Sequence, residues 1–176
     1  MFSYVIMTVD KYRSFALTVR PRNGVTIPIV DALEKYCKTF PHYQMVLEGQ
    51  NESRHAHIQI WLDNPTTKGD ANKKLERVCS RCYDDWDQAQ QKVLRSGTKI
   101  AYNDWLENYC IQNDIKGESN VVLDNRPLDT DPYYPSEEEQ EATQRRSQAV
   151  DQQFCKLELL FEEWNEVQQR SITRRQ

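Results

Sequence analysis

Three prolines within nine residues divide the chain into two parts of different character: Pro127, Pro132 and Pro135. A proline inside a helix removes a backbone hydrogen bond and clashes with the preceding turn, so no helix can run through this segment. We therefore predict a linker over residues 126–135. A domain of residues 1–125 precedes it, and a helical segment of residues 136–176 follows it.

The part after the prolines carries the signals of one long helix. Ser136 is a suitable N-cap, Glu139 stands at the third helical position, and acidic residues fill the first turn. Apolar residues then recur at alternating steps of four and three, which is typical of a coiled-coil seam: Val150, Phe154, Leu157, Phe161 and Trp164. This seam either joins copies of the chain into a homo-oligomer or packs on the chain's own domain.

The net charge of −4 is unevenly distributed. Residues 1–126 carry 17 Lys+Arg and 16 Asp+Glu, whereas residues 127–176 carry 6 and 11. The balanced first part excludes a uniformly basic nucleic-acid binder but permits a locally basic groove. No apolar run approaches the ~20 residues that span a bilayer, so we expect no membrane partner. Five cysteines at irregular spacings indicate an intracellular chain with free thiols.

Strand and helix patterns interleave before the prolines. Runs of β-branched and aromatic residues predict strands at 2–9, 15–19, 43–48, 55–63 and 120–124. Amphipathic or capped runs predict helices at 27–40, 67–82 and 104–112, and short extended pieces are expected at 91–94 and 98–101. Several links have hairpin length, which favours an α+β domain with a largely antiparallel sheet.

The strand at 55–63 has two faces of opposite character. One face is apolar and suits a core: Ala56, Ile58, Ile60 and Leu62. The other face carries His55, His57, Gln59 and Trp61. Two imidazoles at positions i and i+2 project side by side, within reach of one cation. The alternative is that both rings simply face solvent on a half-exposed strand.

A carboxylate can complete this group. Glu48 ends the preceding predicted strand, where alternation places it on one face with Gln44 and Val46. The short polar loop at 49–54 returns the chain beside it, so Glu48 can meet the two imidazoles from the neighbouring strand.

A second group of interest lies on the helix predicted at 104–112. Tyr102 and Tyr109 are seven residues apart, hence on nearly the same helical face. A tyrosine commonly packs half-buried with its hydroxyl in water. It can also act as a nucleophile when a divalent metal polarises a phosphodiester. Both interpretations stay open for these two residues.

At these positions the sequence resembles the replication initiator (Rep) of eukaryotic circular single-stranded DNA viruses. These proteins are HUH endonucleases, named for a His-hydrophobic-His motif. The resemblance covers roughly residues 10–125 and is nearest to the bacilladnavirus Rep, with the exact virus family left open. It rests on motifs in the family's order: Leu17-Thr18-Val19-Arg20-Pro21, Glu48, His55-Ala56-His57 and Tyr109-Cys110-Ile111-Gln112.

The resemblance implies roles for the matched residues. Tyr109 is the expected nucleophile, and a divalent metal, Mn²⁺ or Mg²⁺, is expected on Glu48, His55 and His57. Gln59 is a reserve ligand or supports one. Trp61 and nearby aromatic residues are expected to stack on bases. Further contacts to DNA or phosphate are expected from Arg20, Arg22, Arg54, Gln112 and Lys116.

Two motifs depart from the family. Arg20 and Pro21 replace the two asparagines of the first motif, so contacts to the origin sequence do not carry over there. Gln112 stands where the third motif has a lysine. Lys116, which shares a helical face with Tyr109 if the helix continues, and Lys99 are the two candidates to replace that lysine.

The family fold is a central five-stranded antiparallel sheet with flanking helices, here followed by the long C-terminal helix. The implied activity is site-specific nicking and joining of single-stranded DNA at an origin stem-loop in the host nucleus. A 5′-phosphotyrosine intermediate then starts rolling-circle replication. Family members usually continue into a helicase domain, but no Gly-x-x-x-x-Gly-Lys-Ser/Thr loop occurs in this chain.

Two alternatives to the viral enzyme remain. The first is a non-catalytic module for origin binding and assembly, in which Gln112 marks a degraded site. The second is a relaxase-like or transposase-like HUH enzyme of bacterial origin. Cleavage of a DNA hairpin with and without divalent metal separates the first alternative from an active enzyme.

Overall fold

The protein folds around a five-stranded antiparallel sheet, which confirms the predicted α+β class. The computed structural model describes residues 10–112 and 119–173, with side chains as far as residue 165. The strands are β1 (Tyr12–Val19), β2 (His42–Glu48), β3 (His55–Thr66), β4 (Thr98–Ile100) and β5 (Asn120–Asn125). Their order across the sheet is β4-β1-β3-β2-β5, so β3 is central.

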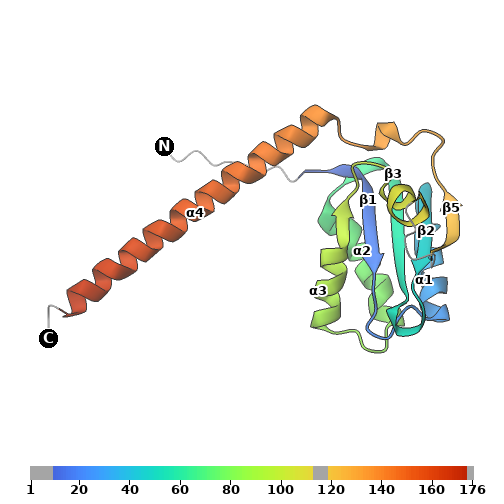
Figure 1. Cartoon of the computed structure of the whole chain (residues 1–176), viewed down its shortest axis with the longest axis horizontal. Coiled ribbons are helices and arrows are strands. Elements are labelled where there is room, and N and C mark those ends of the chain that lie inside the picture. The colour runs from blue at the N-terminus through green and yellow to red at the C-terminus, as the bar shows by residue number, and fades with distance from the viewer. Residues whose placement is uncertain (1–9, 113–118, 174–176) are drawn as a thin grey trace. The chain divides into compact units, whose positions relative to one another are not determined.

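Three helices cover one face of this sheet (Figure 1): α1 (Ile27–Cys37), α2 (Lys68–Cys82) and α3 (Gln88–Gly97). Leu33, Leu75 and Leu94 from these helices join one buried cluster with the apolar side of the sheet. On β3 this side is formed by Ala56, Ile58 and Ile60, as the alternating pattern predicted. The polar side of β3 therefore faces away from α1, α2 and α3.

A short helical turn covers the other face of the sheet. It includes the π-helix Glu107–Gln112, and its residues Leu106 and Cys110 form a small buried cluster with Val46 of β2. The predicted helix at 104–112 is thus present, but it begins at Trp105. Tyr102 precedes this helix, so the expected shared helical face of Tyr102 and Tyr109 is wrong.

Other predicted elements differ in extent or type. The extended piece expected at 91–94 is wrong, because these residues lie within α3. Asp87 caps that helix by accepting a hydrogen bond from the backbone N–H of Gln90, and Leu94 is buried one turn later. Helix α1 ends at Cys37, three residues earlier than predicted. The strand expected at 2–9 lies outside the described residues.

The chain divides after Tyr134 into two units, which are described separately. The first unit includes most of the segment that was expected to be a linker, with a short 3₁₀ turn at Asp131–Tyr133. The second contains α4 (Glu137–Thr173), whose predicted capping box is confirmed. Ser136 N–H donates to Glu139 (2.9 Å), and Glu139 N–H donates to the Ser136 hydroxyl (3.3 Å). Among the described helices, none combines the length and apolar character needed to cross a membrane.

Candidate metal centre

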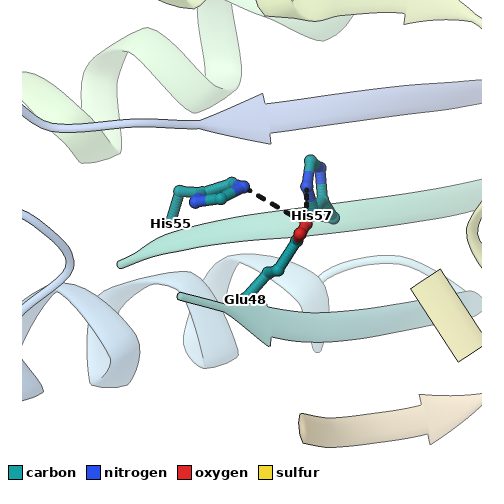
Figure 2. A group of neighbouring side chains, drawn as sticks. All are labelled: Glu48, His55 and His57. Atoms are coloured by element: carbon teal, nitrogen blue, oxygen red, sulfur yellow. Dashed lines mark hydrogen bonds and ion pairs between the residues drawn. The ribbon is translucent and has the colours of Figure 1, made fainter. Parts of the chain in front are cut away.

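Glu48, His55 and His57 lie together, as expected, where β2 and β3 meet in an antiparallel hairpin (Figure 2). In the register of that hairpin Glu48 pairs with His55, and Val46 pairs with His57. One Glu48 carboxylate oxygen, Oε2, lies 3.3 Å from His55 Nε2 and 3.1 Å from His57 Nε2. All three residues are buried, so the alternative of two solvent-facing histidines is wrong.

The turn between the strands has a local cause in the sequence. Gly49 follows Glu48 directly and adopts a φ of +80°, where residues with a Cβ are strained. A Cβ on Gly49 would also lie 2.8 Å from the Ser53 carbonyl oxygen. This tight turn brings β3 back beside β2 in the register that opposes Glu48 and His55.

The partners of His55 determine which ring nitrogen is free. Nδ1 lies 2.8 Å from the Ser53 carbonyl oxygen, which can only accept, so Nδ1 carries the proton. In the neutral ring Nε2 then presents a lone pair. The Glu48 carboxylate lies 3.3 Å from this nitrogen, and the Arg20 guanidinium donates to it over 3.0 Å. Two acceptors this close repel, so positive charge beside them, from Arg20 or from a metal ion, is stabilising.

His57 has a partner that also permits a neutral ring with its proton on Nδ1. Its Nδ1 lies 3.1 Å from the Thr18 hydroxyl, which can either donate or accept. Burial and the neighbouring His55 lower the pKa of His57, although Glu48 acts in the opposite direction. A neutral ring that donates Nδ1–H to Thr18 leaves its Nε2 lone pair toward Glu48, which is the arrangement of a ligating histidine.

This donor set fits a divalent metal ion. The ligand atoms of the three residues lie within 4.8 Å of one another. Two ligand atoms that each lie about 2.1 Å from an ion and subtend a right angle at it are about 3.0 Å apart. This is close to the two observed N···O distances. The group can therefore hold a divalent metal, and two imidazoles with one carboxylate suit a first-row transition-metal ion, Mn²⁺ included.

Arg20 reaches this group. Its Nη2 donates to His55 Nε2 over 3.0 Å, so the guanidinium uses the lone pair that a metal would take. We expected Arg20 to contact DNA. The structure places its side chain against the Glu–His–His group, where its positive charge competes with a metal ion.

Tyr109 lies beside the group, and the residue is more than half exposed (55%). The ring stacks on Trp105, with centroids 5.5 Å apart, and meets the His57 ring edge-on at 5.8 Å. Leu106 and Cys110 anchor the opposite side of the turn on Val46. The π-helical turn therefore holds the Tyr109 ring next to the candidate metal ligands while leaving it accessible.

Gln59 has a different role from the one expected. Its side-chain carbonyl accepts from Leu106 N–H (3.0 Å), and its amide donates to the Asn103 carbonyl (2.9 Å). Gln59 is fully buried, and these bonds fasten the start of the Tyr109 turn to β3. In this arrangement Gln59 positions that turn and is not a metal ligand.

Trp61 is buried and cannot stack on bases, so that expectation is wrong. Its indole N–H donates to the Tyr134 hydroxyl (3.0 Å), which also accepts from Gln59 (3.1 Å). The same hydroxyl donates to Asp104 (2.6 Å). The segment ending at Tyr134 therefore covers this part of the sheet and holds the residues that precede the Tyr109 turn.

The remaining predicted contact residues are separated. Arg22 pairs with Asp87 (3.0 Å) and Asp85 (3.8 Å), away from the histidines, and Arg54 is half-buried at the start of β3. Gln112 is exposed at the end of the π-helical turn. Lys116 lies outside the described residues.

Lys99 lies on the same face of the sheet as the histidines. Ala16 of β1 pairs with Gln59 on one side and with Lys99 on the other, so all three share a face. The exposed Lys99 also lines a cavity of about 200 Å³ with Thr18 and Trp105. Lys99 and Lys116 were the two candidates to replace the motif lysine that is absent at Gln112. Of these, Lys99 is the one that lies among the described residues, near the site.

Several supporting residues were not predicted. Trp105 precedes Tyr109 by four residues, a spacing that signals contact on a helix. Thr18 was recognised only as part of a motif, and its role follows from its pairing with His57 across β1 and β3. Nothing in the sequence signals that Tyr134 binds Asp104 across 30 residues.

Comparison with known proteins provides no further identification. No family model, no curated protein and no solved structure matches the chain.

Proposed function

We propose that the protein is a metal-dependent HUH-type endonuclease that nicks and rejoins single-stranded DNA at an origin stem-loop, as a viral Rep does. The main support is the position of Tyr109, whose phenol is accessible. The centroid of its ring lies 5.8 Å from that of His57, a member of the buried Glu–His–His group. A phenol next to a phosphate-polarising centre is the arrangement that phosphoryl transfer to tyrosine requires.

The proposed reaction is a transesterification. The Tyr109 oxygen forms a bond to phosphorus, and the bond from phosphorus to the 3′-oxygen breaks. The phenol proton ends on that 3′-oxygen, which leaves a free 3′-hydroxyl and a 5′-phosphotyrosine. The reverse reaction rejoins the ends, because the number of phosphoester bonds is unchanged.

The protein residues contribute position and charge. A bound Mn²⁺ or Mg²⁺ on Glu48, His55 and His57 would polarise the phosphate. Trp105 orients the Tyr109 ring by stacking on it, and Gln59 fixes the turn that carries both residues. Lys99, on the same face, can neutralise phosphate charge beside the site.

The test uses the full chain and a pool of 3′-labelled DNA stem-loops with randomised loops. With Mn²⁺ we expect a labelled protein–DNA adduct that resists denaturation, and none with a chelator. Tyr109→Phe should abolish the adduct, whereas Tyr133→Phe should retain it. An adduct that survives Tyr109→Phe would contradict the proposed nucleophile.

A second candidate is a metal-independent module for origin binding and assembly. The Arg20 guanidinium on His55 favours it, because a cationic side chain there can take the place of a metal. This candidate predicts that hairpin binding is unchanged by chelator and that no cleavage product forms. Calorimetric titration of the wild type and of Glu48→Ala with Mn²⁺ separates the two candidates. The enzyme requires that the wild type binds Mn²⁺ and that Glu48→Ala loses this binding, whereas the binding module requires no metal.

A further inference from the structure

The side of the protein opposite the histidines carries a groove between α1 and α2. It encloses about 690 Å³. Its floor includes apolar groups from Ala32, Tyr36 and Val78. Four basic side chains, all exposed, line it: Lys35, Lys74, Arg77 and Arg81. We call this feature the α1–α2 groove.

The basic side chains of the groove have no acidic partners among the described residues, although Lys74 lies over the Phe40 ring. No acidic residue lines the groove, and within the described residues none of its four basic side chains forms an ion pair. Basic residues nearby behave differently, since Lys38 pairs with Glu34 and Lys73 pairs with Asp70. An apolar floor with an unpaired basic rim suits an occupant that is both apolar and acidic.

A buried hydroxyl beneath the groove lacks a partner. The Tyr36 side chain is 4% exposed, and its hydroxyl makes no hydrogen bond to any described residue. A buried polar group without a partner is costly, and such groups are uncommon in folded proteins. Other atoms of Tyr36 line the groove, whereas its hydroxyl is itself buried and is not part of the groove surface.

Helix α4 offers the complementary surface. Five large apolar residues that share one face of this helix are between 57% and 64% exposed: Phe154, Leu157, Leu160, Phe161 and Trp164. Asp151, Glu158 and Glu162 follow one another at steps of seven and four, so they form an acidic edge along one flank of this apolar face. Large apolar patches of this kind mark interaction surfaces.

We propose that α4 of one copy docks in the α1–α2 groove of a second copy. The apolar face would cover the floor, and the acidic edge would meet Arg77 and Arg81, which is the helix-in-groove mode of recognition. We choose a second copy because only Pro135 and Ser136 connect α4 to Tyr134, which is bonded to Trp61 on the opposite face of the sheet. The apolar floor disfavours a nucleic-acid backbone as the occupant.

The interface is heterologous, because the helix of one copy meets the groove of the next. Repetition of such a contact gives a closed ring or an open chain of copies. This differs from a coiled coil, in which the seams of two α4 helices would meet each other. The inference does not depend on the proposed DNA nicking, and either can fail without the other.

Two native cysteines provide the first test. Cys82 lines the groove and is partly buried, whereas Cys155 is exposed on α4 beside the acidic edge. We would treat a mixture of isotopically light and heavy full-length chains with a short bismaleimide. Mildly alkaline pH is needed, because burial raises the pKa of the Cys82 thiol. We expect Cys82–Cys155 peptides that join light to heavy chains, and Cys82→Ser or Cys155→Ser should remove them.

Charge reversal provides the second test, with sedimentation of the full chain as the measurement. The groove variant Arg77→Glu/Arg81→Glu and the helix variant Glu158→Lys/Glu162→Lys should each weaken self-association at least tenfold. The two combined in one chain should largely restore it. Lys73→Glu, a charge reversal on α2 outside the groove lining, is the matched control and should associate as the wild type does.

Each contrary result overturns the proposal in its own way. A wild type that stays monomeric, or a groove variant that still assembles normally, excludes this interface. Cross-links of Cys155 only to Cys155 would show that α4 pairs with itself. Cross-links only within one chain would show that the chain's own helix fills the groove, and loss of DNA binding with normal assembly would identify a nucleic-acid surface.

Discussion

The ring of Trp105 stacks on the ring of Tyr109, with centroids 5.5 Å apart and planes inclined by 11°. The Trp105 ring also meets His57 edge-on at 5.3 Å, so one tryptophan contacts both the proposed nucleophile and a proposed metal ligand. An exposed phenol would otherwise rotate among several positions. The stack therefore limits where the Tyr109 hydroxyl can be presented to a phosphate.

Replacing Trp105 by alanine should lower the rate of hairpin nicking by about 10- to 100-fold, because a loosely held nucleophile reacts from fewer productive positions. Single-turnover cleavage with saturating Mn²⁺ measures this rate. Metal affinity should stay unchanged, since Trp105 donates no ligand atom. Trp105→Phe keeps an aromatic surface and should recover most of the rate. Equal rates for the wild type and Trp105→Ala would contradict a positioning role.

Replacing Arg20 by alanine should strengthen metal binding. The guanidinium donates to His55 Nε2 over 3.0 Å, so a metal must displace this hydrogen bond and bear the repulsion of the charge. We expect Mn²⁺ affinity to rise by about tenfold, which corresponds to ~1.4 kcal/mol. Calorimetric titration measures it.

Arg54→Ala is the matched control for Arg20→Ala. Arg54 is also a basic residue close to β3 in sequence, but its side chain makes no ion pair within the described residues. Its removal should leave Mn²⁺ affinity near the wild-type value. A lower affinity in Arg20→Ala would show instead that Arg20 helps to hold the site together.

The candidate metal centre was predictable because it depends on local rules. Alternation along β3 puts His57 and Ile58 on opposite faces of the sheet. The short turn at Gly49 sets the register in which Glu48 opposes His55. Neither step needs knowledge of distant parts of the chain. The five-stranded sheet followed from the family resemblance, and the structure confirms it.

What the sequence did not predict depends on contacts between distant segments. Trp61 was expected to stack on bases, but the segment that ends at Tyr134 covers it. Gln59 lies on the same face of β3 as the two histidines, as a ligand would. Its side-chain carbonyl nevertheless accepts from the N–H of Leu106, 47 residues away. Alternation states which face a side chain is on, whereas the packing of other segments decides what it meets there.

Replacing Lys99 by alanine should weaken binding of a stem-loop substrate and slow its cleavage. Lys99 shares a face with Gln59 and lines the cavity beside Thr18 and Trp105, where a phosphate next to the reacting one can lie. We expect about a tenfold loss of cleavage at low salt and a smaller loss at high salt, because salt screens the charge. Lys92→Ala, on α3, should have little effect. If the Lys99→Ala variant is as active as the wild type at low salt, Lys99 does not take the role of the motif lysine that is absent at Gln112.

Replacing Tyr134 by phenylalanine should destabilise the first unit of the chain. The lost hydroxyl accepts from Trp61 and Gln59 and donates to Asp104 over 2.6 Å, so the buried indole N–H would be left without its partner. We expect the free energy of unfolding to fall by about 1–3 kcal/mol. Urea denaturation followed by tryptophan fluorescence measures this change.

Tyr133→Phe is the matched control for that substitution, because the Tyr133 ring meets the His42 ring in a T-shaped contact and its hydroxyl makes no hydrogen bond within the described residues. Its free energy of unfolding should match that of the wild type within error. Asp104→Asn should reproduce part of the Tyr134→Phe effect, since it weakens the acceptor of the same hydroxyl. If Tyr134→Phe proves as stable as Tyr133→Phe, then the Tyr134 bonds to Trp61, Gln59 and Asp104 do not hold this segment on the sheet.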